Sequence, residues 1–144
     1  MAPLWVAYQA NLGTLLRTCD AVGACLAVPN TKHYRQSVEI GNTLARPPCI
    51  HWVDGDRLAW LEVRRADGST VVGVELADGA LSLAQVAPAR RRTVICLGHE
   101  RFGLPDQAWA LLDTVVEIPM VGTGASLNVA VAGSLVLYKL AGLL

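Results

Sequence analysis

The sequence predicts an α/β fold in which a largely parallel β-sheet is flanked by helices. Three observations support this prediction. Short apolar runs alternate with segments of helical periodicity through all 144 residues. Runs such as residues 94–97 contain no polar residue, which is typical of parallel strands covered on both faces. Hydrophobic residues make up 53% of the chain, as a buried sheet, a subunit interface or a membrane segment would require.

The first half of the chain predicts strands and helices in alternation. Apolar runs favour strands at residues 4–8, 25–28 and 49–53. After the first run, apolar residues fall on one helical face, so a helix is expected to begin near Asn11 and to stop at Gly23. A weaker signal favours a short helix over residues 38–44, and a clearer one predicts a helix over residues 57–65.

The second half continues the alternation. Strands are expected at residues 71–76, 94–97 and 115–118. Between them, residues 77–89 predict a loop with a helical turn at residues 81–83, and residues 105–113 predict a short helix with proline in its first turn. The final helix, residues 127–144, is apolar nearly all round, which predicts burial in a core or at a subunit interface. Ser126 precedes it, as an N-cap residue would.

The charge balance excludes one class of protein. Lys and Arg number 12, as do Asp and Glu, so the formal net charge is zero. A freestanding electrostatic nucleic-acid binder would usually be basic, whereas an enzyme needs only a local basic patch. Such a patch would bind phosphate if it lay near the site. The local basic candidates are residues 90–92, residues 64–65, and Lys32 with Arg35.

No membrane segment or leader is expected. Residues 125–144 have about the length of a spanning helix, but they include Ser126, Asn128 and Lys139. The first residues lack the basic region and long apolar core of a signal peptide. We therefore expect a cytoplasmic protein.

The cysteines form no recognisable metal motif. They are Cys19, Cys25, Cys49 and Cys96, and their spacings contain no CxxC pair and match no common zinc pattern. We expect them to be small buried residues, and we expect no metal ion.

Two glycine-rich turns follow apolar runs in the last third of the chain. They span residues 97–105 and 118–128, and the final helix follows the second. A strand, a glycine turn and a helix in succession bring backbone amides to a ligand in α/β proteins. Two such turns close together predict one site built from both.

Three ordered groups of residues carry the chemical signal. They are Asn11, Gly13 and Arg17, then Gly98, Glu100, Gly103 and Leu104, and finally residues 118–120 with residues 126–128. These groups resemble the motifs N-x-G-x-x-x-R, G-x-E-x-x-G-L, and I-P-M followed by S-L-N of the SpoU (TrmH) family, within the SPOUT superfamily of methyltransferases. The resemblance extends from Leu4 to Leu144.

The resemblance implies a fold and an activity. The fold would be a SPOUT-type α/β knot with a deep C-terminal trefoil knot, in a single domain over residues 1–144 without an N-terminal RNA-binding extension. The activity would be methylation of a ribose 2′-hydroxyl in tRNA or rRNA with S-adenosylmethionine, by a homodimer that packs through its C-terminal helix. The alternative is a non-catalytic, SPOUT-like dimeric RNA-binding module. A nicotinamide-binding Rossmann domain is disfavoured because no G-x-G-x-x-G turn follows the first expected strand.

The same resemblance assigns site residues. Those expected to bind the cofactor are Leu97, Gly98, Gly103, Ile118, Met120, Ser126 and Leu127. Those expected to act in catalysis are Asn11, Arg17, Glu100, Ser126 and Asn128. Arg17 would be either the base, which its pKa above about 12 makes difficult, or a bidentate clamp on the substrate phosphate.

Overall fold

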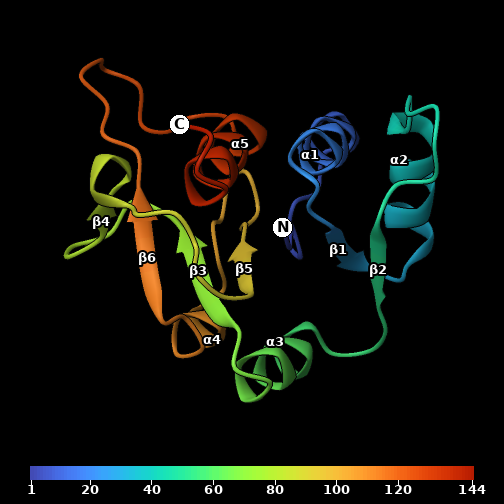
Figure 1. Ribbon diagram of the computed structural model, residues 1–144, viewed down its shortest axis with the longest axis horizontal. Helices are drawn as coiled ribbons and strands as arrows, with labels where there is room; N and C mark the ends of the chain where they lie inside the picture. Colours follow the sequence, from blue (N-terminus) through green and yellow to red (C-terminus); the bar gives the residue numbers. More distant parts are fainter.

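Every pairing between strands is parallel, as the sequence predicts (Figure 1). The computed structural model describes all residues from 1 to 144. Its strands are β1 (Leu26–Pro29), β2 (Ile50–Val53), β3 (Thr70–Val74), β4 (Leu81–Ser82), β5 (Thr93–Cys96) and β6 (Thr114–Glu117). Strands β1 and β2 form one pair, and the others lie in the order β4-β6-β3-β5. The carboxyl ends of β3, β5 and β6 therefore meet at one edge, where open α/β sheets bind ligands.

The first residues of the chain join the two sheets. Ala2 forms a parallel bridge with Cys96 of β5, and its N–H donates to the Ile95 carbonyl at 2.7 Å. On the other side, the N–H of Ala27 in β1 donates to the Met1 carbonyl at 2.8 Å. The N-terminal residues thus lie between β5 and β1, and Figure 1 shows the chain start in this position.

The prediction of a strand at residues 4–8 is wrong. Leu4 and Val6 are fully buried, but their carbonyl groups meet side chains instead of a neighbouring strand. The Tyr34 hydroxyl lies 3.0 and 2.8 Å from the carbonyl oxygens of Leu4 and Val6. Arg57 Nη1 also donates to the Leu4 carbonyl at 2.7 Å. Since a buried polar group needs only one partner, these side chains replace the strand ladder that the apolar run predicted.

The helices match the prediction in number and differ in extent. They are α1 (Gln9–Val22), α2 (Lys32–Gly41), α3 (Arg57–Ala66), α4 (Asp106–Trp109) and α5 (Val129–Leu140). The predictions for α1 and α3 are confirmed, and Gly23 ends α1 with a φ of 71° that glycine adopts without strain. Helix α2 starts before the expected residues 38–44 because its buried face is Tyr34, Ser37 and Val38. The polar Ser37 hid the apolar periodicity.

The other boundary errors lie in the second half. The expected helical turn at residues 81–83 is β4 followed by a 3₁₀ turn, Leu83–Gln85. Helix α4 is shorter than residues 105–113 because the chain then turns into the sheet, and the Asp113 N–H donates to the Val71 carbonyl at 2.8 Å. Helix α5 is shorter than residues 127–144. No helix combines the length and apolar character that a membrane crossing requires.

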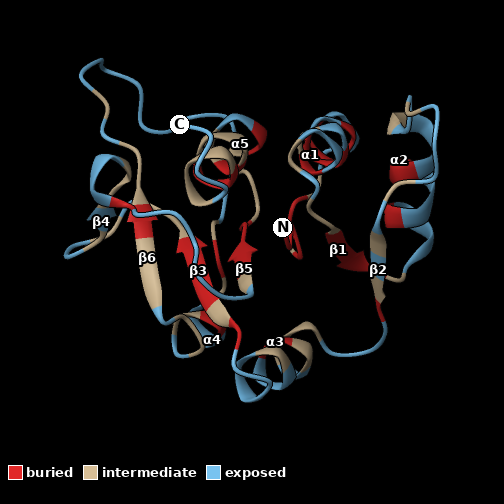
Figure 2. Ribbon diagram, in the orientation of Figure 1, coloured by how far each residue is buried: buried red, intermediate tan, exposed pale blue.

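The core fills the space between the sheets and the helices. Figure 2 shows buried residues along β1, β3 and β5 and on the inner faces of α1 and α5. Leu15 of α1, Leu97 after β5 and Val136 of α5 belong to the larger apolar cluster. A Cβ atom at Gly133 would lie 2.7 Å from Cδ1 of Leu97, so α5 packs directly against the end of β5. This packing fixes the start of α5 relative to the carboxyl edge of the sheet.

The expectation that all four cysteines are small buried residues is wrong for two of them. Cys19 and Cys96 are free and buried, but Cys25 and Cys49 form a disulfide with a Cα–Cα distance of 4.6 Å. The parallel pairing of β1 with β2 places the residues preceding the two strands side by side. The His51 ring nitrogen lies within 4.8 Å of both sulfur atoms. Because these sulfur atoms are bonded to each other, they are not thiolate ligands for a metal ion.

Candidate functional site

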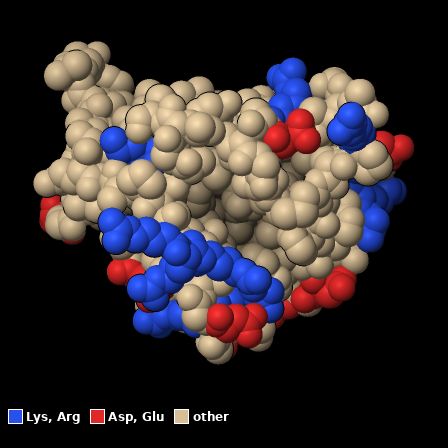
Figure 3. Space-filling model, viewed as in Figure 1, with Lys and Arg blue, Asp and Glu red and all other residues tan.

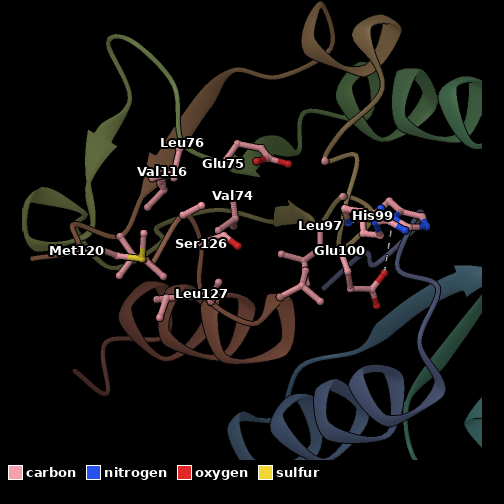
Figure 4. Close-up of a pocket in the computed structure, with 17 residues that line it drawn as sticks. Val74, Glu75, Leu76, Leu97, His99, Glu100, Val116, Met120, Ser126 and Leu127 are labelled. Atoms are coloured by element: carbon pink, nitrogen blue, oxygen red, sulfur yellow. Dashed lines mark hydrogen bonds and ion pairs between the residues drawn. The ribbon is translucent and has the colours of Figure 1, made fainter. Parts of the chain in front are cut away.

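The carboxyl edge of the larger sheet contains a cavity of about 260 Å³ (Figure 4). Val74 ends β3, Leu97 follows β5 and Val116 lies in β6, and all three line the cavity. Val129 and Ala132, in the first turns of α5, line it from the helix side. The cavity therefore occupies the position at which parallel α/β sheets bind small molecules.

The two glycine-rich turns meet at this cavity. All seven residues that the sequence assigned to the cofactor line it: Leu97, Gly98, Gly103, Ile118, Met120, Ser126 and Leu127. The first turn follows β5 and the second follows β6, and these strands flank β3 on opposite sides. Figure 4 shows Leu97 and Glu100 at one end of the cavity and Met120 and Leu127 at the other. Contact of these residues with a cofactor stays a prediction.

The first turn is closed by its own backbone. His99 and Gly103 exchange backbone hydrogen bonds of 2.9 and 2.8 Å. A Cβ atom at Gly98 would lie 2.2 Å from the carbonyl carbon of Gly103, so no larger residue fits without moving the turn. Gly103 has a φ of 67°, which favours glycine. Both glycines are therefore needed to build this wall of the cavity.

Glu75 is a cavity residue that the sequence analysis missed. It follows β3, lines the cavity, and accepts a hydrogen bond from the Leu104 N–H at 3.0 Å. Burial raises the pKa of the Glu75 carboxyl, and the Leu104 N–H partly opposes this effect. The signal that could have found it is a carboxylate at the end of an apolar run, because the carboxyl ends of parallel strands carry ligand sites.

A chain of hydrogen bonds links the three sequence motifs. Asn11 Nδ2 donates to Glu100 Oε1 at 2.8 Å, and Asn128 Nδ2 donates to Asn11 Oδ1 at 3.0 Å. Asn11 lies in the first turn of α1 and is buried. Residues from α1, the β5 turn and the start of α5 are thus fixed relative to one another beside the cavity.

Glu100 is held as a carboxylate. Its two oxygens accept hydrogen bonds of 2.9 Å from the N–H groups of Ala7 and Tyr8, as well as the bond from Asn11. Burial alone would raise the pKa of Glu100, but these donors outweigh it and lower the pKa below its ordinary value. The carboxylate is therefore ionised at neutral pH and anchors the segment that leads into α1.

The expectation that Ser126 caps the last helix is wrong. Asn128 is the N-cap of α5, and its Oδ1 accepts hydrogen bonds from the N–H groups of Ala130 at 2.9 Å and Val131 at 3.2 Å. An asparagine amide oxygen reaches these groups as readily as a serine hydroxyl does. Ser126 instead lines the cavity.

Arg17 stands apart from the other predicted residues. It is exposed on α1, does not line the cavity, and forms no ion pair within the chain. The step from Asn11 to Arg17 advances about 9 Å along α1 and turns by about 240°. The two side chains therefore leave the helix on different faces, and the Arg17 guanidinium is free to meet another molecule.

The glycine of the first motif has a packing role. A Cβ atom at Gly13 would lie 2.9 Å from the Cα atom of Gly41 in α2, and one at Gly41 would lie 2.6 Å from the Cα atom of Gly13. The backbones of α1 and α2 touch at this point. Gly13 therefore positions α1, and with it Asn11, without contacting the cavity.

Comparisons with known proteins agree with these motifs. Residues 5–138 match the SpoU rRNA Methylase family. The tRNA (guanosine(18)-2'-O)-methyltransferase TARBP1 of Mus musculus is 33% identical over 136 residues, covering 90% of this chain and 8% of that protein. The tRNA (guanosine(18)-2'-O)-methyltransferase of Escherichia coli K12 is 31% identical over 133 residues, covering 90% of this chain and 56% of that protein.

Solved structures show the same fold. An AdoMet-bound rRNA methyltransferase from Sinorhizobium meliloti superposes with a TM-score of 0.79 at 28% identity, covering 96% of this chain and 54% of that chain. The chain thus spans about half the length of the two bacterial proteins.

Proposed function

The chain belongs to the SpoU rRNA Methylase family, and we propose that it transfers a methyl group from S-adenosylmethionine to a ribose 2′-hydroxyl of tRNA or rRNA. The observation that carries this proposal is the hydrogen-bond chain from Glu100 through Asn11 to Asn128, because it joins all three family motifs beside one cavity. Relatives named for tRNA and a structural neighbour named for rRNA support both substrate classes. These RNA substrates favour a cytoplasmic location.

The cavity has the chemistry that S-adenosylmethionine needs. Leu97, Ile118 and Leu127 offer apolar surface for the adenine ring, and the two turns offer backbone N–H and C=O groups for its polar edge. The cavity volume of about 260 Å³ lies just below the usual range for small-molecule sites, about 300–1,000 Å³. When bound, this cofactor supplies a methyl group that its sulfonium sulfur activates for transfer. The Sinorhizobium meliloti neighbour was solved with AdoMet bound, which supports the assignment.

Three of the predicted catalytic residues act by positioning. The Asn11 side-chain amide donates a hydrogen bond to Glu100 and accepts one from Asn128. The Asn128 oxygen is in turn occupied by the backbone of α5. Side-chain amides do not exchange protons near neutral pH, and the hydrogen bonds that lower the pKa of Glu100 make its carboxylate a weak base. These groups hold α1, the first turn and α5 in one geometry, and methyl transfer depends strongly on such alignment.

Arg17 is the residue we assign to the RNA. A free guanidinium has a pKa above about 12 and is a poor base, whereas it binds phosphate bidentately. Arg17→Ala should leave cofactor affinity unchanged and reduce methyl transfer by roughly 10²-fold or more. Arg17→Lys keeps the charge without the bidentate geometry, so its rate of methyl transfer should lie between those of the wild type and Arg17→Ala. Unchanged transfer by the alanine variant would remove Arg17 from the mechanism.

The direct test is product identification. The protein would be incubated with methyl-labelled S-adenosylmethionine and either bulk tRNA or rRNA, and the RNA digested to nucleosides for mass spectrometry. We expect label only on ribose 2′-oxygens. Label on a base would contradict the proposed reaction. Cofactor and RNA binding without transfer would favour the alternative, a non-catalytic dimeric RNA-binding module.

We also propose a homodimer that packs through α5. Apolar side chains at the start of this helix are exposed next to the site: Val131 of α5 is 48% exposed, and Leu127, which precedes the Asn128 cap, is 40% exposed. A partner subunit covering them would bury this surface and place its own residues near the cavity. Light scattering coupled to gel filtration should give twice the chain mass, and Val131→Asp should shift it towards the monomer. A wild-type monomer would contradict this proposal.

The sheet order supports the trefoil knot that the resemblance implies. Strands β6 and β5 lie on opposite sides of β3, yet the chain runs from β6 to α5, and α5 packs against Leu97 just after β5. The segment between β6 and α5 must therefore cross from one side of β3 to the other. We infer that this crossing is the knotted passage.

A further inference from the structure

The three consecutive arginines of the chain, Arg90, Arg91 and Arg92, are unpartnered. All three are exposed, and none of the ion pairs in the structure involves them. By contrast, Arg64 pairs with Asp67 at 2.9 Å, and the neighbouring arginine of α3 is paired as well. We call residues 90–92 the arginine loop. Three free cations on one loop form a local positive charge in a chain whose formal net charge is zero.

The space-filling view supports a continuous basic surface. Figure 3 shows Lys and Arg side chains as a band across one face of the molecule, with the acidic side chains mainly towards its margins. In Figure 1 the segment that leads into β5 crosses the same part of this face. Guanidinium groups in such an array match the regularly spaced phosphates of a nucleic acid backbone.

The arginine loop lies far from the cavity. It precedes β5, and the Thr70 N–H at the start of β3 donates to the Arg92 carbonyl at 2.9 Å, so the loop lies at the amino edge of the sheet. The Ala89 N–H donates to the carbonyl of Leu140, the last residue of α5, at 2.7 Å. Helix α5 therefore runs from the Asn128 cap to the arginine loop, and its 12 residues span about 18 Å.

The basic candidate at Lys32 and Arg35 lies in a segment whose side chains contact the rest of the chain. In the segment that starts α2, the His33 ring lies 2.8 Å from the Ala7 carbonyl, and Tyr34 is buried. Arg35 lies 4.5 Å from the centre of the Trp52 ring and donates to Asn30. His33, Tyr34 and Arg35 thus hold α2 to its own chain, whereas the three side chains of the arginine loop form no ion pair within the chain.

We propose that the arginine loop binds the phosphate backbone of the substrate RNA at a distance from the methylated ribose. This proposal rests on the proposed function and adds a second point of contact to it. An RNA that reaches both the cavity and the loop must extend along α5, so the protein would hold a structured region and not only the nucleotide that it modifies. The loop would then add affinity and orientation, and the cavity would carry the chemistry.

The test is the salt dependence of RNA binding. Three phosphate contacts, each with a slope of about 0.7 for a single strand, raise affinity by about 10²-fold at 0.1 M salt. Replacing Arg90, Arg91 and Arg92 together by alanine should weaken binding of bulk tRNA by that factor. The slope of log affinity against log salt should also fall by about 2. Cofactor affinity and the transfer rate at saturating RNA should not change.

Two controls keep the result specific. Replacing the same three arginines by lysine keeps the charge and should retain the salt slope. Arg46→Ala removes an exposed arginine from the segment before β2 and should change the affinity little. If the wild type methylates RNA but the triple alanine variant keeps the wild-type affinity and slope, the inference is overturned and the proposed function stands. If the wild type neither binds nor methylates RNA, the proposed function itself fails.

Discussion

Asn11→Asp tests the hydrogen-bond network most sharply. Asn11 Nδ2 donates to Glu100 at 2.8 Å, and Asn11 Oδ1 accepts from Asn128 at 3.0 Å. An aspartate keeps the acceptor towards Asn128 but replaces the donor by a carboxylate oxygen that faces the Glu100 carboxylate. We expect the free energy of unfolding at neutral pH to fall by about 1.5–3 kcal/mol for the lost bond to a charged group, with carboxylate repulsion added to this loss.

The repulsion should give the variant a pH dependence that the wild-type pair lacks. In the wild type, hydrogen bonds hold the pKa of Glu100 below its ordinary value. The stabilisation of the fold by this carboxylate is therefore complete above the pKa that Glu100 has in the unfolded chain. It is lost only as pH falls through the lower pKa of the folded chain. In the variant, the carboxyl pair binds a proton with a raised pKa. If this pKa lies about two units above the ordinary carboxyl value, the loss of unfolding free energy at pH 8 exceeds the loss at pH 5 by about 1.4 kcal/mol.

The assay is urea unfolding at pH 5 and pH 8, followed by circular dichroism and compared with the wild type at each pH. Asn42→Asp is the matched control, because Asn42 Oδ1 accepts from the Leu44 N–H at 3.1 Å and an aspartate keeps that bond. Its stability should change by less than about 0.5 kcal/mol. Equal losses for Asn11→Asp at both pH values would refute the expected repulsion between the introduced carboxylate and that of Glu100.

Three further predictions concern the helix cap, the first turn and the disulfide. Asn128→Ala removes the cap of α5 and should lower the unfolding free energy by about 1 kcal/mol in urea titrations; no change would show that the cap is dispensable. Gly98→Ala places a methyl group 2.2 Å from the carbonyl carbon of Gly103, so calorimetry should show roughly tenfold weaker cofactor binding, and full affinity would contradict this packing. The Cys25–Cys49 disulfide spans 24 residues, and replacing both by serine should lower the unfolding free energy by about 3 kcal/mol. A thiol reductant should have the same effect on the wild type, and no loss in either case would mean that the pair is not joined in solution.

Local patterns predicted most of the elements. Helix α1 shows an apolar face and ends at Gly23, so its extent follows from periodicity and one glycine. The turns that follow parallel strands all lie at one edge of the sheet. The turns at Gly98 and at Ile118 could therefore be assigned to one site from the sequence alone. Asn11, Glu100 and Asn128 could be grouped only through the resemblance, because nothing local connects residues 89 or 117 positions apart.

The errors arose where long-range partners decide the structure. Leu4 and Val6 form an apolar run, but Tyr34 and Arg57 supply the hydrogen bonds that a strand would have supplied. Cys25 meets a second cysteine only because of the register between β1 and β2.

The measurement that tests the central claim most directly is calorimetric titration of the purified protein with S-adenosylmethionine and with S-adenosylhomocysteine. We predict that both bind, with about one ligand per chain, as the single cavity formed by the two turns implies. A folded protein that binds neither compound, with or without bulk RNA present, would contradict the assignment of this cavity to the methyl donor.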